Sequence, residues 1–291
     1  MDSTTFDADF MRKLEFLRLV AQKLFRGRYR GEHISRRKGS SLEFYDYRSY
    51  QPGDDFRYID WNIYSRLGRL FVKLFTAEED LMIHILLDTS ASMRFGEPSK
   101  LDYAKQVGAT LGYIGIANLD RVRANAFRDK IDHSFDPSTS SAFELFHFFD
   151  RLVAGGDTNI DRGLIDYAKS TRHPGLAIII SDLFDPKGYQ DGLNALRYAG
   201  HDIMLLQILS EDEIAPKLEG SVLLTDSETG TQVKVSIDRR VREAYLSRFT
   251  EFTESIDRFC IKNQIEYARA DTGVPFEDLV LKYLRQGIYL H

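Results

Sequence analysis

The sequence has little of what a secreted or membrane-spanning protein needs. Its 291 residues include a single cysteine, Cys260, which cannot form an intrachain disulfide, so we expect a reducing compartment. The first ten residues contain three aspartates and no lysine or arginine, unlike the basic start of a secretory signal. Its apolar runs, such as 175–180, are far shorter than the roughly 20 residues that cross a bilayer as a helix. The expectation is a cytoplasmic protein with no membrane span.

A strong excess of charge is also absent, because the formal net charge is only -5. Hydrophobic residues make up 43% and charged residues 29%, which is typical of a globular chain rather than a disordered one. This mild acidity gives no reason to expect a nucleic acid partner. The basic stretch from Arg26 to Lys38 could follow a phosphate backbone, but we favour a solvated loop or a docking face for an acidic partner. The role of this stretch stays open.

Strand and helix patterns alternate along most of the chain and predict an α/β fold with a doubly wound, mostly parallel sheet. Stretches typical of strands buried on both faces lie at about 81–87, 121–127, 176–180, 202–209 and 265–270. Helical patterns separate them at about 99–119, 140–153, 160–170 and 189–199. The end of the chain predicts an inserted β-hairpin at 222–225 and 232–237, then a helix at 239–262 packed on the sheet.

Residues 1–79 are predicted to form an N-terminal extension docked on a domain of residues 80–291. The extension begins with an amphipathic helix at about 7–25. The segment from Arg48 to Trp61 then carries closely spaced opposite charges, a composition suited to docking. The alternative is that Arg48, Arg57 and Trp61 present a partner-binding surface.

An acid and two hydroxyls alternate just after the first predicted sheet strand, as Asp88, Ser90 and Ser92. In an open α/β sheet, ligand sites form beyond the carboxyl ends of the strands. Oxygens spaced in this way can converge on a hard cation such as Mg²⁺. Aspartate and serine are also common in ordinary turns and helix caps, so this motif alone leaves a purely structural role open.

Two later segments strengthen the metal hypothesis. The glycine-rich loop 155–159 places the hydroxyl of Thr158 just before a predicted helix. Asp182 follows the predicted strand at 176–180, so its carboxylate belongs to the same edge of the sheet. In this order and context the chain resembles the von Willebrand factor A fold and its metal-ion-dependent adhesion site (MIDAS).

That resemblance implies a site for Mg²⁺, or for Mn²⁺ or Ca²⁺, made by five residues. Ser90, Ser92 and Thr158 would bind the cation through their hydroxyls, and Asp88 and Asp182 would act directly or through water. The alternative is a degenerate A-type domain that keeps these residues without the ion. The partner implied for such a site is a protein that offers an aspartate or glutamate to the metal.

The segment from Gly39 to Arg66 resembles the signature of domain-of-unknown-function family 58. It contains Gly-Ser-Ser-Leu-Glu-Phe at 39–44, Pro-Gly-Asp-Asp at 52–55 and Ile-Asp-Trp at 59–61. This largely bacterial family has A-type domains and is commonly encoded beside MoxR-type AAA+ ATPases. The resemblance implies an adaptor that works with such an ATPase in chaperone-like assembly or maturation.

The predicted function is a non-catalytic binding module rather than an enzyme. The alternative is a Mg²⁺-dependent phosphatase or phosphotransferase with Asp88 as nucleophile. Such enzymes usually have a second aspartate where this chain has Ser90, and a helix-borne lysine that the sequence pattern does not locate. His84 and His147 lie in apolar stretches and are expected in the core or at an interface.

Overall fold

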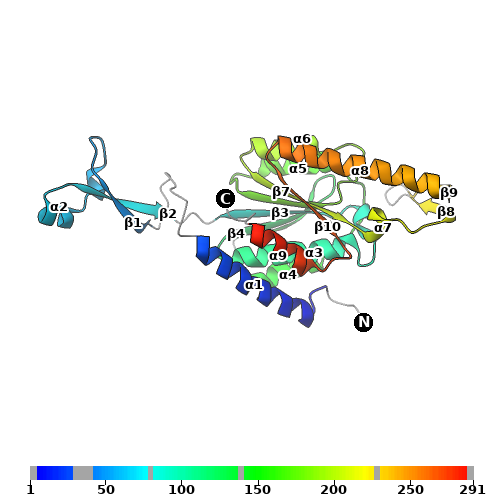
Figure 1. The fold of residues 1–291 in the computed structure, drawn as a ribbon, viewed down its shortest axis with the longest axis horizontal. Coiled ribbons are helices and arrows are strands. Elements are labelled where there is room, and N and C mark those ends of the chain that lie inside the picture. Colours follow the sequence, from blue (N-terminus) through cyan, green and yellow to red (C-terminus); the bar gives the residue numbers. More distant parts are fainter. Residues whose placement is uncertain (1–4, 29–41, 78–80, 137–140, 226–229, 287–291) are drawn as a thin grey trace. The chain divides into compact units, whose positions relative to one another are not determined.

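The computed structural model describes residues 5–28, 42–77, 81–136, 141–225 and 230–286 (Figure 1). The chain forms two compact units. The larger unit comprises residues 1–25 and 81–291, and the smaller unit comprises residues 26–80.

A six-stranded sheet forms the centre of the larger unit. Its strands are β3 (Met82–Asp88), β4 (Arg121–Phe127), β5 (Ile131–Phe135), β6 (Leu176–Ser181), β7 (Asp202–Leu209) and β10 (Glu266–Asp271). The spatial order is β10-β7-β6-β3-β4-β5, and every neighbouring pair is parallel except β4 and β5. This confirms the doubly wound, mostly parallel sheet of the von Willebrand factor A type. The antiparallel edge strand β5 was not predicted.

Helices cover both faces of this sheet (Figure 1). One layer contains α1 (Ala8–Arg28), α3 (Lys100–Ala117), α4 (Ala142–Asp150) and α9 (Phe276–Gln286). The other layer contains α5 (Ile160–Ser170), α6 (Gln190–Tyr198) and part of α8 (Arg239–Lys262). Side chains of a strand alternate between faces, so Ile85 and Leu87 belong to the first core and Leu86 belongs to the second.

Most of helix α1, residues 8–25, belongs to the larger unit. Phe10, Leu14 and Leu17 lie in its core, and each is at most 2% exposed. The first helix of the predicted extension therefore packs in the core of the larger unit, and the division at residue 79 stays a prediction. The docking of the remaining extension on the A-type domain stays a prediction.

The smaller unit is a two-stranded antiparallel sheet with a short helix in its connection. The strands are β1 (Leu42–Ser49) and β2 (Phe71–Ala77), and η1 (Phe56–Tyr58) and α2 (Trp61–Leu67) lie between them. Asp60 caps α2 by accepting the N–H groups of Asn62 and Ile63. A hydrogen bond from Lys73, together with these backbone bonds, lowers the pKa of Asp60 to about 2.

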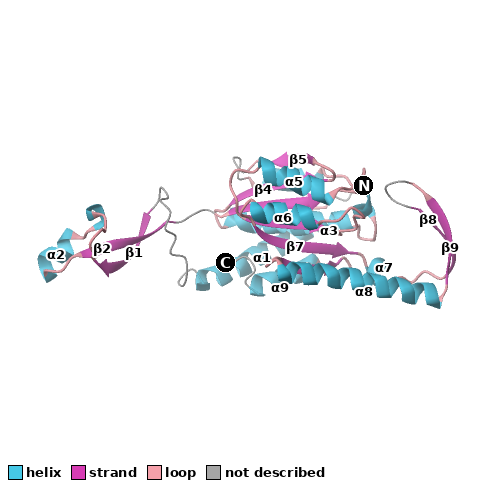
Figure 2. Cartoon of the chain, turned by 90° about the horizontal axis from the view of Figure 1, so that it is seen from above, coloured by secondary structure: helices cyan, strands magenta, loops and turns pink. Residues whose placement is uncertain are grey.

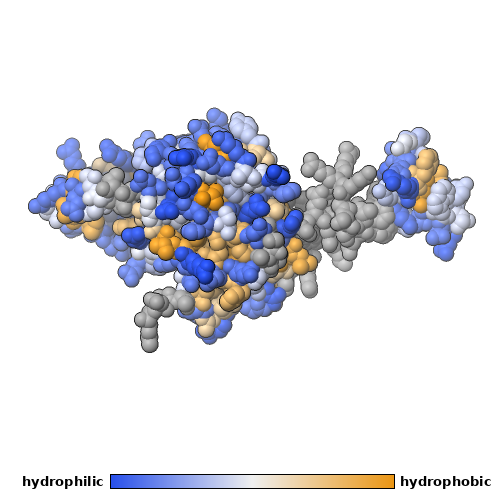
Figure 3. Space-filling view, turned by 180° about the vertical axis from the view of Figure 1, so that it is seen from behind, coloured by the Kyte–Doolittle hydropathy of each residue, from blue (hydrophilic) through white to orange (hydrophobic). Residues whose placement is uncertain are grey.

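The predicted charged segment pairs within this smaller unit. Arg48 Nη2 donates to Asp54 Oδ1 at 2.8 Å, and Arg57 Nη2 donates to Asp55 Oδ2 at 2.6 Å. Trp61 is 59% exposed, in line with the apolar side chains on the surface of this unit (Figure 3). These two ion pairs form within the smaller unit, and the expected docking role of the charged segment stays a prediction.

Helix α8 corrects one prediction. A hairpin of β8 (Gly220–Thr225) and β9 (Gln232–Ile237) leads into the amino-terminal end of this helix (Figure 2). Val241 and Tyr245 are each 39% exposed, whereas Ile256 and Cys260 are buried, so only the second half packs on the sheet. The physical reason is length. A helix of 24 residues is about 36 Å long, and a strand of six to eight residues spans only about 20–27 Å.

Two further expectations have mixed outcomes. His84 is fully buried, as predicted, whereas His147 is exposed on α4 and stacks against Phe143. His147 therefore does not lie in the core, and its expected place at an interface stays a prediction. Among the helices of the described ranges, none combines the length and the apolar character that a membrane span requires.

Candidate metal site

The five predicted site residues belong to three loops at the carboxyl edge of the sheet. The chain leaves β3 towards β4 on one side and returns later to β6 on the other side. Neighbouring strands whose connections diverge in this way leave a crevice beyond their carboxyl ends, where ligands bind. Asp88 is the last residue of β3 and Asp182 directly follows β6, so the two carboxylates flank this switch point.

Asp88 is completely buried and both of its carboxylate oxygens are fixed. Oδ1 accepts the N–H of Ser90 at 2.8 Å, and Oδ2 accepts the hydroxyl of Ser181 at 2.6 Å. Burial raises the pKa of Asp88 to about 7, and repulsion from the Asp182 carboxylate adds to this increase. The ionised form of Asp88 is therefore disfavoured unless a positive charge lies nearby.

The two serines present their hydroxyls to each other. Ser90 Oγ and Ser92 Oγ are 3.1 Å apart, and Ser90 is fully buried. Ser90 is the N-cap residue of η2 (Ala91–Arg94), but its side chain makes no capping hydrogen bond. The alternative in which this serine is only a helix cap is thus not supported by the geometry.

Thr158 contributes a buried hydroxyl that has no hydrogen-bond partner among the described residues. The residue is 4% exposed. Its loop is joined to the serine loop, because Ala91 N–H donates to Gly156 O at 3.3 Å and Gly155 N–H donates to Thr89 O at 3.0 Å. A buried hydroxyl without a partner costs free energy, which points to a ligand that accepts its lone pairs.

Asp182 is paired with a residue that the sequence analysis did not find. Lys100, the first residue of α3, is fully buried, and its Nζ lies 2.6 Å from Asp182 Oδ2 and 2.5 Å from Glu213 Oε1. Burial alone would lower the pKa of Lys100, but the two carboxylates outweigh it and raise that pKa. The available signal was a lysine directly after the capping Ser99, at the start of a helix that follows the site loop.

This donor set fits a divalent metal ion bound by oxygen. In the described part of the chain, no group of three or more His, Cys, Asp or Glu side chains is placed to hold a metal. A metal at this edge would thus depend on hydroxyls, from Ser90, Ser92 and Thr158, beside the carboxylates of Asp88 and Asp182. Mg²⁺ and Mn²⁺ accept such hard oxygen ligands and commonly keep water in the remaining positions.

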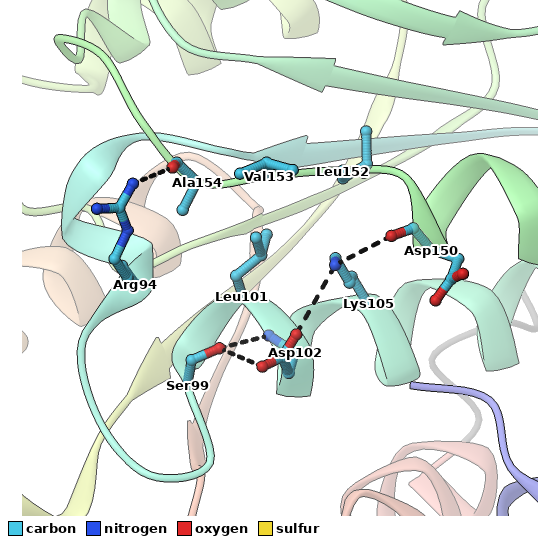
Figure 4. A pocket seen from close by; sticks show the side chains of 9 residues that line it. All are labelled: Arg94, Ser99, Leu101, Asp102, Lys105, Asp150, Leu152, Val153 and Ala154. Atoms are coloured by element: carbon cyan, nitrogen blue, oxygen red, sulfur yellow. Dashed lines mark hydrogen bonds and ion pairs between the residues drawn. The ribbon is translucent and has the colours of Figure 1, made fainter. Parts of the chain in front are cut away.

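A cleft of about 320 Å³ opens beside these loops (Figure 4). Arg94, two residues after Ser92, donates to Ala154 O at 2.6 Å and lines one end of the cleft. Lys105 Nζ lies at its other end, 3.4 Å from Asp150 O. The cleft therefore combines charged groups with apolar ones, including Leu101 and Leu152.

Comparisons with known proteins match most of the chain to one family. It matches the family described as "Protein of unknown function DUF58" over residues 46–254. An uncharacterized protein of Mycobacterium tuberculosis is 26% identical over 241 residues, which cover 80% of this chain and 75% of that protein.

Two solved structures are similar at lower identity. One is an aerotolerance-related membrane protein from Bacteroides fragilis, with 18% identity, a TM-score of 0.45, and 71% of this chain and 99% of that chain covered. The other is a von Willebrand factor type A structure from Catenulispora acidiphila, with 13% identity, a TM-score of 0.38, and 73% and 42% covered. At these scores the fold assignment rests on the strand order itself.

Proposed function

The chain belongs to the DUF58 family of proteins of unknown function, and we propose that it is a non-catalytic, metal-dependent protein interaction module. The observation that carries the proposal is the unpartnered hydroxyl of buried Thr158, on a loop whose backbone is hydrogen-bonded to the loop that carries Ser90 and Ser92. These groups lie at the edge of the sheet that also holds two buried carboxylates. A divalent cation would use the lone pairs and offset the negative charge.

The partner that fits this site is a protein that offers an aspartate or glutamate. Three of the five ligands are neutral hydroxyls, so the cation would keep much of its positive charge and attract an incoming carboxylate. The cleft beside Arg94 gives neighbouring partner residues a place to bind. Its mixed lining suits a polypeptide with both polar and apolar side chains.

For the partner protein we propose a MoxR-type AAA+ ATPase, with this chain as a cytoplasmic adaptor in chaperone-like assembly or maturation. The support for this choice is the sequence resemblance of the Gly39 to Arg66 segment together with membership of the family. The acidic-partner requirement gives the choice a physical criterion, because a suitable ATPase must expose a carboxylate that reaches the metal.

The structure contains one feature that favours the phosphatase alternative and one that opposes it. Lys100 supplies a helix-borne lysine near the acids, which such an enzyme would need. The proposed nucleophile, however, is fully buried, and both oxygens of Asp88 accept hydrogen bonds from Ser90 and Ser181. A carboxylate held in this way is poorly placed to attack a phosphorus atom. We therefore propose that the protein has no intrinsic phosphatase or ATPase turnover.

The metal part of the proposal is tested by titration calorimetry with Mg²⁺ and Mn²⁺ on the full chain. Thr158→Val keeps the side-chain shape and removes the unpartnered hydroxyl, so metal affinity should fall at least about tenfold. The matched control is Thr110→Val, which removes another buried threonine hydroxyl, one that donates to Gln106 O within α3. Equal affinities for the two variants would contradict the proposed site.

The partner part is tested by capture of a purified MoxR-type ATPase with and without EDTA. Direct metal bridging predicts that EDTA and Thr158→Val both abolish capture. The rival is that the partner binds the basic stretch from Arg26 to Lys38, which lies largely outside the described residues. Capture that survives EDTA and Thr158→Val but fails in Arg36→Glu/Arg37→Glu would reject metal bridging.

A further inference from the structure

A buried ion network extends from the site to helix α7 (Glu211–Ile214). Lys100 is fully buried and donates to both Asp182 and Glu213. Its ammonium also lies 5.1 Å from the ring centroid of Phe184. A lysine in the first turn of a helix is opposed by the helix dipole, and burying its charge is strongly unfavourable unless it is paired. This position is therefore explained by the acids around Lys100 rather than by the helix.

Glu213 is held in place independently of the lysine. Its Oε2 accepts the N–H of Ser210 at 2.9 Å, and Ser210 Oγ accepts the N–H of Glu213, which completes a capping box. The hydroxyl of Tyr245 on α8 donates to Glu213 O at 2.7 Å. Lys100 thus bridges a preorganised glutamate, which lies 31 positions after Asp182 in the sequence, to the carboxylate of Asp182.

The formal charges of this buried set match a divalent cation. Asp88, Asp182 and Glu213 contribute three negative charges, and Lys100 contributes one positive charge, so the ionised set carries two negative charges. Lys187, which donates to Thr158 O at 3.2 Å, is exposed, so water screens its charge. Within the protein interior, charge compensation strongly affects whether an ion is bound.

We propose that Lys100 is a positioning residue that sets the charge selectivity of the metal site, with Glu213 as its second counter-ion. Lys100 fixes the Asp182 carboxylate and cancels one negative charge, so the site favours a divalent over a trivalent cation. This inference rests on the proposed metal site and adds to it a residue pair that does not touch the metal loops' hydroxyls.

The test compares Mg²⁺ and Tb³⁺ affinities of the full chain by calorimetry and terbium luminescence. Lys100→Met should tighten Mg²⁺ binding at least about tenfold and tighten Tb³⁺ binding more, because one negative charge is no longer cancelled. Glu213→Gln should weaken both. Lys100→Met/Glu213→Gln restores the original charge sum and should bind Mg²⁺ within about threefold of the unmodified chain. Lys100→Arg keeps the charge and should keep the ratio of the two affinities.

A purely structural role for Lys100 gives a different pattern. It predicts weaker binding of both ions in Lys100→Met and no change in the Tb³⁺ to Mg²⁺ ratio, and that result would overturn the inference. If Lys100→Met does not fold, Glu213→Gln and the double variant decide, since the double variant leaves no extra uncompensated charge. Failure of the unmodified chain to bind Mg²⁺ would overturn the proposed function and this inference together. Normal binding with unchanged variants would overturn only the inference.

Discussion

Strand β3 carries two buried ionisable residues, His84 near its start and Asp88 at its end, in contrasting surroundings. His84 Nδ1 lies 2.7 Å from the hydroxyl of Tyr167, and its ring packs edge-on against His201 with centroids 4.7 Å apart. Burial, with a contribution from His201, lowers the pKa of His84 to about 3. This cluster therefore stays neutral at physiological pH.

The opposite end of the same strand holds charge. Asp88 and Asp182 are buried together, and Lys100 compensates only part of the negative charge of the network. An unpartnered polar atom does not distinguish the two ends, because His84 Nε2, like Thr158 Oγ1, lacks a partner among the described residues. The two ends therefore differ in charge. A ligand is expected at the carboxyl end of β3 because uncompensated negative charge lies there beside the unpartnered hydroxyl of Thr158.

The largest expected decrease in stability comes from removing one charge of the buried ion network. Lys100→Met leaves the carboxylates of Asp182 and Glu213 without their cation, so the free energy of unfolding in EDTA should fall by about 3–5 kcal/mol. The control is Asp129→Ala, whose partner Arg162 lies 3.7 Å away in a pair with side chains 43% and 62% exposed. This control should cost less than about 1 kcal/mol. Urea denaturation measures the free energy of unfolding of both variants. Similar decreases would show that the buried ion pair of Asp182 contributes no more to stability than an exposed one.

The second prediction concerns the neutral cluster around His84, which should make the free energy of unfolding depend on pH. The folded-state pKa of His84 lies near 3, below the unfolded value of about 6.5, so the unfolded chain binds the proton first. The contribution of His84 to the free energy of unfolding should therefore be constant above about pH 6.5 and decrease by a few kcal/mol as the pH decreases towards 3. The raised pKa of Asp88 acts in the opposite direction, so the contribution of His84 is read from the difference between the unmodified chain and His84→Gln. His84→Gln cannot take up this proton and should flatten part of the decrease, with His201 supplying the remainder because burial lowers its pKa too.

The measurement for this second prediction is urea denaturation at a series of pH values, in EDTA. The matched control is His147→Gln, at an exposed position on α4. A decrease in stability on acidification that is the same in His84→Gln and in the control would contradict the neutral-cluster account.

The smallest expected effect compares one hydroxyl from each end. In EDTA, Thr158→Val removes a buried hydroxyl without a partner and should raise the free energy of unfolding by about 1 kcal/mol. Tyr167→Phe removes the hydroxyl bonded to His84 and should lower it by about 1 kcal/mol. Differential scanning calorimetry would show melting shifts of opposite sign. A loss of stability in both variants would mean that the Thr158 hydroxyl already has a partner within the folded chain.

Much of the fold could be predicted because strands buried on both faces are continuous apolar runs. β4 and β7 have the predicted bounds, and the residues after β3 and β6 were identified from the ends of such runs. β5 was not predicted because Ile131–Phe135 is short and has only one buried residue. The apolar stripe of α8 predicted the helix itself. The same stripe runs along the whole helix, so it could not show that only the second half of α8 packs on the sheet.

The candidate site was predictable only as far as local sequence reaches. Asp88, Ser90 and Ser92 lie together in one loop, and parallel topology brings the loops of Thr158 and Asp182 to the same edge. Lys100 could not be assigned from its surroundings in sequence, because its partners lie 82 and 113 positions further along the chain. A buried charge is defined by such distant contacts rather than by local pattern.

The most direct test of the central claim is anomalous diffraction from crystals of the chain grown with Mn²⁺. The account predicts a strong peak roughly 2–2.5 Å from the hydroxyl oxygens of Ser90, Ser92 and Thr158, beside the carboxyl ends of β3 and β6. No peak between these three hydroxyls in Mn²⁺-saturated crystals, or a peak only at another group of acids, would contradict the metal site.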